Sequence, residues 1–243
     1  KVKSSIAADC HPCIINQRRS AARSEELDEA QTERVINVAK AGLEKSKSEP
    51  LLAQHIVRYA ADAIIKERGE SSDFDIYAEV KKKSNLLALA YADGFKEKIK
   101  HSHSPLESGI QIAAAGNIID FGAKDHATLN IEAELQLLDK VPFERYDFMA
   151  LKQALDGASL LLYLCDNSGE IVFDMLFIKE IKSAYPHLQI IAAVRGTPII
   201  NDATLEDAKM VGLDRLVKTV SSGSIYPGTI LPETSKEFQQ LFA

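Results

Sequence analysis

The chain has 243 residues, with 29 Lys and Arg against 35 Asp and Glu, which gives a formal net charge of −6 at pH 7. Hydrophobic residues make up 46% of the chain, as in an ordinary globular protein of one or two domains. The acidic balance argues against non-specific nucleic-acid binding, which depends on Lys and Arg. The longest apolar runs are far shorter than the ~20 residues of a membrane span. We therefore expect neither a nucleic-acid nor a membrane partner, and we make no prediction of the oligomeric state.

The first hundred residues have the spacing of amphipathic helices. Apolar residues recur about every 3.6 positions over residues 27–45, 51–66 and 75–99. Polar breaks separate these segments at 46–50 and 67–73. The run Lys81-Lys82-Lys83 is expected to form one solvated helix face. We predict an all-helical module over residues 1–105.

After residue 105 the pattern changes to short apolar runs that alternate with helical segments. The predicted strands are 110–115, 159–165, 188–194 and 215–220, and the predicted helices are 170–185 and 203–211. Nearly continuous apolar strands between helices indicate a parallel sheet covered on both faces. We therefore predict an α/β fold in which residues 106–243 form a Rossmann-like, three-layer α/β/α domain with a mainly parallel sheet.

Polar residues follow these predicted strands, where ligands of open α/β sheets bind. The three loops are 116–120, 166–170 and 195–202. Asp166, Asn167 and Asp202 offer oxygen ligands that suit Mg²⁺ or Mn²⁺. The start of the helix after residue 168 offers N–H groups to an anion such as phosphate. The candidates for binding a phosphorylated substrate are Asn117, Asp120, Ser168, Gly169, Arg195 and Gly196. A metal beside a phosphate indicates phosphoryl chemistry.

Each of these residues also has a purely structural interpretation. Asp166 and Asp202 each precede a predicted helix and could be N-caps. Arg195 could form a surface ion pair, and Asn117 and Asp120 could be turn residues.

Asp166 also loosely resembles the nucleophile of haloacid-dehalogenase-type phosphatases, but Ser168 stands where that family has its second Asp. A nicotinamide site is disfavoured because no GxGxxG follows any strand.

The cysteines do not form a disulfide framework. Cys10 and Cys13 make a CxxC, which is half a zinc site at most, and a structural, metal or redox role stays open for it. Cys165 ends a predicted strand, so core packing is expected. An odd number of cysteines fits a reducing cytoplasm, and we expect a cytoplasmic protein.

Four motifs, in order, resemble those of one known family, the metal-dependent damage-control phosphatases, first catalogued as domain of unknown function 89. The motifs are Asp9-Cys10-x-x-Cys13-x-x-x-Gln17, Gly116-Asn117-x-Ile119-Asp120-Phe121-Gly122, Asp166-Asn167-Ser168-Gly169-Glu170-Ile171-Val172-Phe173-Asp174 and Arg195-Gly196-x-Pro198-Ile199-Ile200-Asn201-Asp202-Ala203-Thr204. The matches extend from residue 9 to about residue 232, and the CxxC start resembles the prokaryotic subfamily.

The resemblance implies a helical module and a Rossmann-like domain that holds a divalent metal, Mn, Co, Ni or Mg, through Asp166, Asn167 and Asp202. It implies hydrolysis of phosphate monoesters of sugar phosphates or damaged phosphometabolites. In that mechanism Asp202 or Glu170 orients or deprotonates the attacking water, while Arg195 holds phosphoryl oxygens. The alternatives are a non-catalytic phosphometabolite-binding protein and an S-adenosylmethionine-dependent carboxyl methyltransferase, an activity proposed for a eukaryotic branch.

The family pattern continues beyond the segment at 238–242, into a strand and a Lys-Gly-x-Gly-Asn loop whose Lys touches the phosphate. The sequence stops at Ala243. We therefore expect this chain to lack the last strand and the phosphate-contacting loop.

Overall fold

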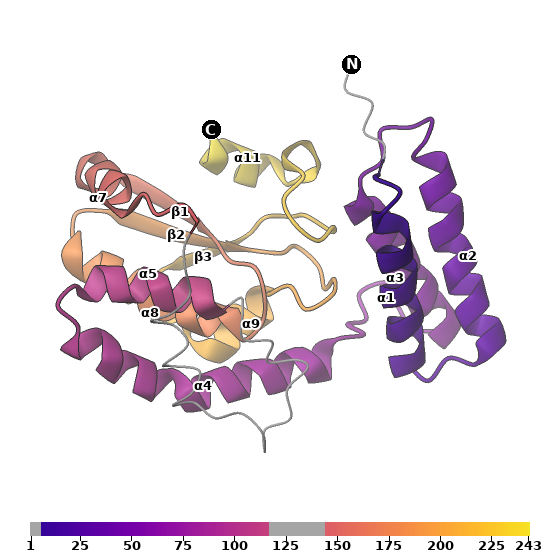
Figure 1. The fold of residues 1–243 in the computed structure, drawn as a ribbon, viewed down its shortest axis with the longest axis horizontal. Coiled ribbons are helices and arrows are strands. Elements are labelled where there is room, and N and C mark those ends of the chain that lie inside the picture. Colours follow the sequence, from indigo (N-terminus) through magenta and orange to yellow (C-terminus); the bar gives the residue numbers. More distant parts are fainter. Residues whose placement is uncertain (1–5, 117–143) are drawn as a thin grey trace. The chain divides into compact units, whose positions relative to one another are not determined.

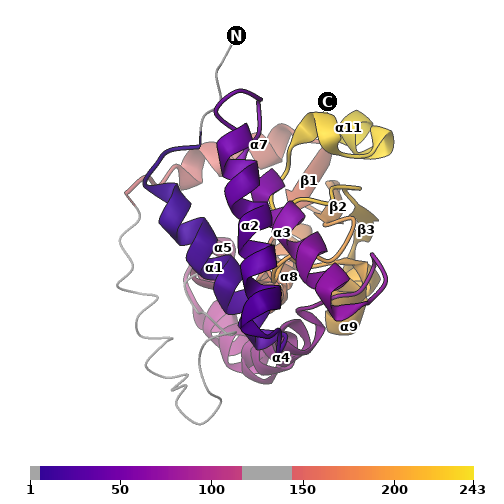
Figure 2. The ribbon, with the colours of Figure 1, turned by 90° about the vertical axis from the view of Figure 1, so that its right-hand side faces the viewer.

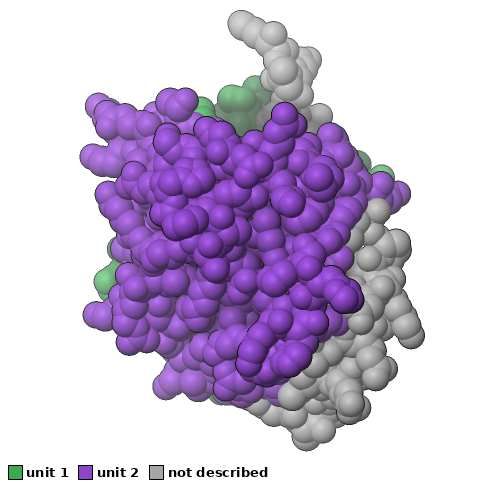
Figure 3. Space-filling model, turned by 90° about the vertical axis from the view of Figure 1, so that its left-hand side faces the viewer, with its two compact units in different colours: residues 1–77, 197–200, 223–235 green, residues 78–196, 201–222, 236–243 purple. Residues whose placement is uncertain are grey.

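The computed structural model describes residues 6–116 and 144–243. Its contacts divide the chain into two compact units. The first contains residues 1–77, 197–200 and 223–235, and the second contains residues 78–196, 201–222 and 236–243 (Figure 3). The expected domain boundary near residue 105 falls inside the second unit and stays a prediction. Within the described ranges, no helix is both long and apolar enough to cross a membrane.

The first unit is built from helices α1 (Cys10–Ser24), α2 (Glu29–Lys45) and α3 (Ala53–Arg68) (Figure 1). Helix α2 begins at a capping box, in which Asp28 accepts the N–H of Gln31 and the Gln31 side chain accepts the N–H of Asp28. Helix α3 ends at Gly69, whose φ of 73° is a left-handed conformation that favours glycine. Apolar residues of the three helices pack into one core, which includes Val35, Ala39, Ile56, Ala60 and Ile64. The prediction of an all-helical N-terminal part is confirmed.

The second unit begins with two helices, α4 (Ala78–His101) and α5 (Pro105–Gly116). The strand predicted at 110–115 is wrong, because this segment lies inside α5. Small residues explain the difference: a Cβ added at Gly109 would lie 3.1 Å from Phe177, and one added at Gly116 would lie 2.8 Å from Phe173. Glycines on one side of the helix thus let α5 approach the helix that carries both phenylalanines. Short apolar runs are ambiguous between strand and buried helix.

The sheet of the second unit has three parallel strands in the order β1-β2-β3. They are β1 (Leu160–Leu164), β2 (Gln189–Val194) and β3 (Lys218–Ser221). Helix α8 (Glu170–Ala184) connects β1 to β2, and helices α9 (Leu205–Val211) and α10 (Leu213–Leu216) connect β2 to β3. The predicted strand at 215–220 therefore begins later than expected, because its first residues end α10.

Helices lie on both sides of this sheet. In Figures 1 and 2, α7 (Phe148–Gly157) and α11 (Lys236–Phe242) lie on one side of the strands, and α8, α5 and α4 lie on the other. Strand β2 is buried from Ile190 onwards, whereas Leu160 and Leu164 at the ends of β1 are exposed. Helix α8 is buried without interruption from Ile171 to Ile178. This confirms the expected α/β fold with a parallel sheet and with helices on both faces.

Candidate active site at the carboxyl ends of strands β1 and β2

The loops that follow β1 and β2 are joined through their backbones. Asn167 and Asp202 form an isolated antiparallel bridge. Beside it, the N–H of Ala203 donates to the carbonyl of Asp166 over 2.7 Å. These bonds give the side chains of both loops fixed positions relative to each other, as expected of neighbouring parallel strands.

An arginine lies between the two acidic residues that the sequence singled out. Arg195 Nε donates to Asp202 Oδ2 over 2.5 Å, and its Nη2 lies 3.4 Å from Asp166 Oδ1. The side chains of Arg195 and Asp202 are only 7% and 2% exposed, whereas that of Asp166 is 52% exposed. One buried cation thus faces a buried carboxylate on one side and a solvent-accessible carboxylate on the other. Arg195 is therefore not part of a surface ion pair.

The N-cap interpretation of the two aspartates is wrong as well. The N-cap of α8 is Gly169, and the N-cap of α9 is Thr204. Asp166 and Asp202 precede these caps and point their carboxylates to Arg195 instead. Charged side chains that converge without a role in starting a helix are typical of a functional site.

Asn167 and Glu170 extend the cluster. The Asn167 amide nitrogen lies 3.2 Å from Asp166 Oδ2 and 3.1 Å from Glu170 Oε2. Burial raises the pKa of Glu170, the hydrogen bond from Asn167 lowers it, and the negative charges of Asp166 and Asp202 raise it further, so the pKa lies above its ordinary value. Glu170 is thus the more suitable proton acceptor of the two candidates, because Asp202 is already paired with a buried arginine.

The polar groups of Ser168 and Gly169 bond to other segments of the protein. The Ser168 N–H donates to the carbonyl of Asn201 over 2.9 Å, and its hydroxyl donates to Asp207 over 3.1 Å. The Gly169 N–H donates to Asn85 Oδ1 over 2.7 Å. Both N–H groups that we expected to bind phosphate therefore already have protein acceptors. Their assignment as phosphate donors stays a prediction, and the contacts favour a role in holding the loop.

Sequence reasoning missed the residues behind this loop. Lys81, which we placed on a solvated face, is 3% exposed and pairs with Asp207 over 2.9 Å. That prediction is wrong for Lys81, because Lys81 lies on the side of α4 that packs against α9, the helix that carries Asp207. Two signals were present in the sequence: Lys81 and Asn85 are one helical turn apart, and Thr204-x-x-Asp207 has the spacing of a capping box.

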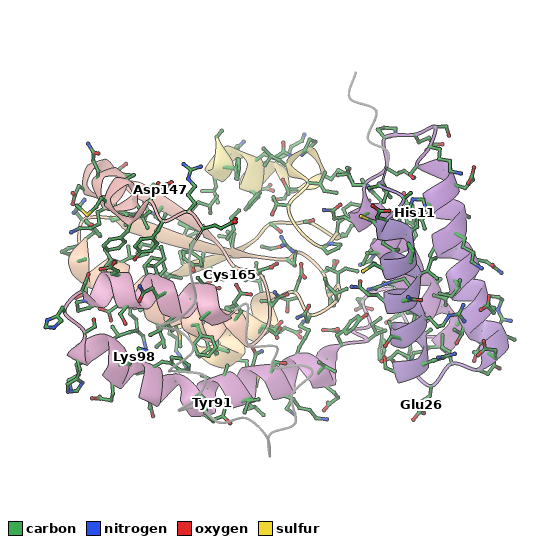
Figure 4. The ribbon with its side chains drawn as sticks, viewed as in Figure 1. His11, Glu26, Tyr91, Lys98, Asp147 and Cys165 are labelled. Atoms are coloured by element: carbon green, nitrogen blue, oxygen red, sulfur yellow. The ribbon has the colours of Figure 1, made fainter. Side chains whose placement is uncertain are left out.

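The remaining candidates lie apart from this cluster or outside the described residues. Asn117 and Asp120 belong to the part of the chain that the structure does not describe, and Gly196 is exposed. Cys10 and Cys13 flank His11 at the start of α1 and are both exposed (Figure 4). Cys165, which directly follows β1, is buried as expected.

The oxygen donors of the site fit a divalent cation only with the help of an amide. In the described ranges, no three His, Cys, Asp or Glu side chains lie close enough to hold a metal ion by themselves. Asn167 lies in the loop after β1, is bridged to Asp202 of the other loop, and would complete a set with Asp166 and Asp202. Carboxylate and amide oxygens are the hard donors that Mg²⁺ and Mn²⁺ prefer. The donor set therefore suits such an ion.

A buried acid lies behind strand β1, next to this cluster. Asp174 of α8 is 4% exposed and accepts a hydrogen bond from the Tyr163 hydroxyl over 2.6 Å. Burial raises the pKa of Asp174 to about 8; hydrogen bonds from Tyr163 and Cys165 oppose the shift, and the charge of Glu170 adds to it. The site thus has a protonated carboxyl group at its base.

Comparison with known proteins points to one family. The family described as the damage-control phosphatase ARMT1-like domain matches residues 6–243. An uncharacterized protein of Methanocaldococcus jannaschii is 34% identical over 246 residues, which cover 98% of this chain and 77% of that protein. The damage-control phosphatase PH1575 of Pyrococcus horikoshii is 36% identical over 169 residues, 69% of this chain and 57% of that protein. A damage-control phosphatase of Archaeoglobus fulgidus is 35% identical over 166 residues, 67% of this chain and 56% of that protein.

A solved structure agrees with these sequence matches. The crystal structure of the DUF89 family protein PH1575 superposes with a TM-score of 0.81 and 28% identity, covering 98% of this chain and 80% of that chain. The alignments to the two proteins named as phosphatases thus span little more than half of their lengths, while the fold matches over nearly the whole chain. The chain belongs to the damage-control phosphatase ARMT1-like domain family, also called DUF89.

Proposed function

We propose that this chain is a divalent-metal-dependent phosphatase that hydrolyses phosphate monoesters of sugar phosphates or damaged phosphometabolites. The observation that carries the proposal is the position of Arg195 between Asp166 and Asp202, at the carboxyl ends of neighbouring parallel strands. Such an arrangement offers carboxylates to a metal ion and a guanidinium to phosphoryl oxygens in one place. The relatives named damage-control phosphatases support it.

Asp166, Asn167 and Asp202 would hold the metal ion, which we expect to be Mn²⁺, Co²⁺, Ni²⁺ or Mg²⁺. When bound, such an ion lowers the pKa of a coordinated water and neutralises charge on the phosphoryl group. Asp166 is the ligand most open to solvent, and Asp202 is fixed by its backbone bridge to Asn167.

The other residues position the reactants and move the proton. Arg195, held in place by Asp202, would bind phosphoryl oxygens through its planar set of donors. Glu170 would accept the proton of the attacking water, since its pKa is raised and its carboxylate lies next to Asn167. Most of the rate would come from positioning and electrostatic stabilisation, as is usual for phosphoryl transfer. We also propose a cytoplasmic location, on the grounds of the three cysteines without a disulfide.

The first test is phosphate release from a panel of phosphometabolites, with each of the four metal ions compared. Asp166→Ala should abolish metal-dependent hydrolysis of p-nitrophenyl phosphate while the circular dichroism spectrum stays native. Asp156→Ala, which removes an exposed aspartate of α7, is the matched control and should keep full activity. Full activity of Asp166→Ala would refute the metal assignment. Sugar phosphate that binds to the wild-type chain without phosphate release by any ion would indicate a binding protein instead.

A further inference from the structure

A buried asparagine of helix α4 contacts the loop that carries the site. Asn85 is 0% exposed. Its Oδ1 accepts the Gly169 N–H over 2.7 Å, and its Nδ2 donates to Asp207 Oδ1 over 2.8 Å. Gly169 has a φ of 85° and a ψ of −56°, a conformation that glycine adopts without a Cβ clash. The hydrogen bond to Asn85 fixes the Gly169 N–H at this point of the loop.

Asp207 of α9 ties the same loop to two further elements. Its Oδ1 also accepts the Ser168 hydroxyl over 3.1 Å, and its Oδ2 accepts both the N–H and the hydroxyl of Thr204, each over 2.8 Å. Lys81 Nζ lies 2.9 Å from the same oxygen. A carboxylate has about four lone-pair sites, so this one is fully engaged. Burial tends to raise the pKa of Asp207, but the charge of Lys81 and the hydrogen bonds outweigh it and leave the pKa below its ordinary value.

Stability alone is a poor reason for this network. The side chains of Lys81 and Asp207 are 4% and 7% exposed, and a buried ion pair generally contributes little to stability compared with apolar residues of the same size. What such a network provides is a single geometry, because each donor and acceptor has one partner direction. The geometry that it fixes here is that of Ser168 and Gly169.

We propose that Asn85 and Asp207 are positioning residues of the active site, which act through Ser168 and Gly169 to hold Asp166, Asn167 and Glu170 in their catalytic arrangement. The proposal rests on the proposed function for its catalytic part. Residues behind a metal site typically change metal affinity or activity by about 10- to 100-fold when they are removed.

An isosteric substitution makes the proposal testable through pH. In Asn85→Asp, one carboxylate oxygen still accepts the Gly169 N–H, while the other faces Asp207 Oδ1 where a donor was. Two facing carboxylates share one proton, so the pKa of the pair is raised. At acidic pH the shared proton restores a hydrogen bond between position 85 and Asp207. As the pH rises the proton dissociates and this hydrogen bond is lost. The ratio of kcat between Asn85→Asp and wild type should therefore fall about tenfold or more from pH ~5.5 to pH ~8. For Asn85→Ala the ratio should be low at both values.

Two measurements do not depend on turnover. In Asn85→Ala, hydrogen exchange of the amides at 167–170 should become at least about tenfold faster, while exchange in β2 stays unchanged. The Kd for Mn²⁺, measured by calorimetry, should rise about 10- to 100-fold. Ile99→Ala is the control: it opens a cavity on the same helix, about 21 Å along the helix axis from Asn85, and should lower the melting temperature without changing loop exchange or Mn²⁺ affinity.

The outcomes separate this inference from the proposed function. If the wild type releases phosphate from no substrate, the proposed function fails, and loop exchange still decides whether Asn85 positions the loop. Loop exchange equal to that of the wild type in Asn85→Ala would overturn the inference. So would a pH-independent kcat ratio for Asn85→Asp, or a change in Ile99→Ala as large as that in Asn85→Ala.

Discussion

The protonated carboxyl group behind strand β1 gives a stability prediction of definite sign. Asp174 is 4% exposed, and its pKa is raised to about 8 from an ordinary value of 3.8. In the unfolded chain the same group is ionised above about pH 4. Between these two pKa values the folded state binds one more proton than the unfolded state. The free energy of unfolding therefore falls as the pH rises through this window.

The magnitude follows from the linkage relation. One extra proton in the folded state changes the free energy of unfolding by about −1.4 kcal/mol per pH unit. From about pH 5 to about pH 7 the contribution of Asp174 is thus a loss of nearly 3 kcal/mol, as an upper bound. Asp174→Asn removes this group without changing its shape. Its amide oxygen can still accept the hydrogen bond from the Tyr163 hydroxyl, and its amide nitrogen can donate to the Cys165 sulfur.

The assay is urea unfolding of wild type and Asp174→Asn at a series of pH values, with a chelator present so that no metal ion contributes. We expect the wild type to lose about 2–3 kcal/mol more than the variant between about pH 5 and pH 7. Asp156→Asn, at an exposed position on α7, is the control and should follow the wild-type slope. Parallel curves for wild type and Asp174→Asn would refute the reasoning, because they would mean that Asp174 is ionised in the folded protein.

Two further substitutions test packing and capping. Gly116→Ala places a Cβ 2.8 Å from Phe173 Cδ2 and should lower the free energy of unfolding by about 1–3 kcal/mol. Gly94→Ala on α4, where a Cβ meets nothing within 4 Å, should leave the free energy of unfolding unchanged or raise it. Equal urea midpoints for the two variants would contradict the packing argument. Asp28→Ala removes the capping box of α2 and should cost about 1 kcal/mol, whereas Asp28→Asn should cost much less. A melting temperature of Asp28→Ala equal to that of the wild type would show that the cap contributes nothing.

The sheet and the edge that carries the site could be predicted from the sequence. The apolar runs at 159–165 and 188–194 form β1 and β2, as their short length and the Gly- and Asn-containing loops that follow them favour. Once the strands are parallel, their carboxyl ends meet at one edge. That geometry brings Asp166 and Arg195 to one edge, and the bridge between Asn167 and Asp202 brings Asp202 to the other side of Arg195. Their convergence required no knowledge of side-chain packing.

Helix α5 could not be predicted in the same way. Its sequence at 110–115 is as apolar as a buried strand, and the period of hydrophobicity does not distinguish the two. The choice depends on Gly109 and Gly116, which face Phe177 and Phe173 of α8. These contacts join residues more than 50 positions apart in the chain, and only the folded structure shows that the glycines meet large side chains.

The protonation states of the two buried aspartates behind the site could not be predicted from the sequence. Asp174 and Asp207 are both aspartates and are 4% and 6% exposed, yet the pKa of Asp174 is raised to about 8 and that of Asp207 is lowered. The difference is Lys81, whose ammonium lies 2.9 Å from Asp207, whereas Asp174 accepts hydrogen bonds from a hydroxyl and a thiol. A net charge of −6 contains no information about which carboxylate receives a buried cation. The protonation state of each acid behind the site is therefore set by a pairing across helices, which composition and spacing do not encode.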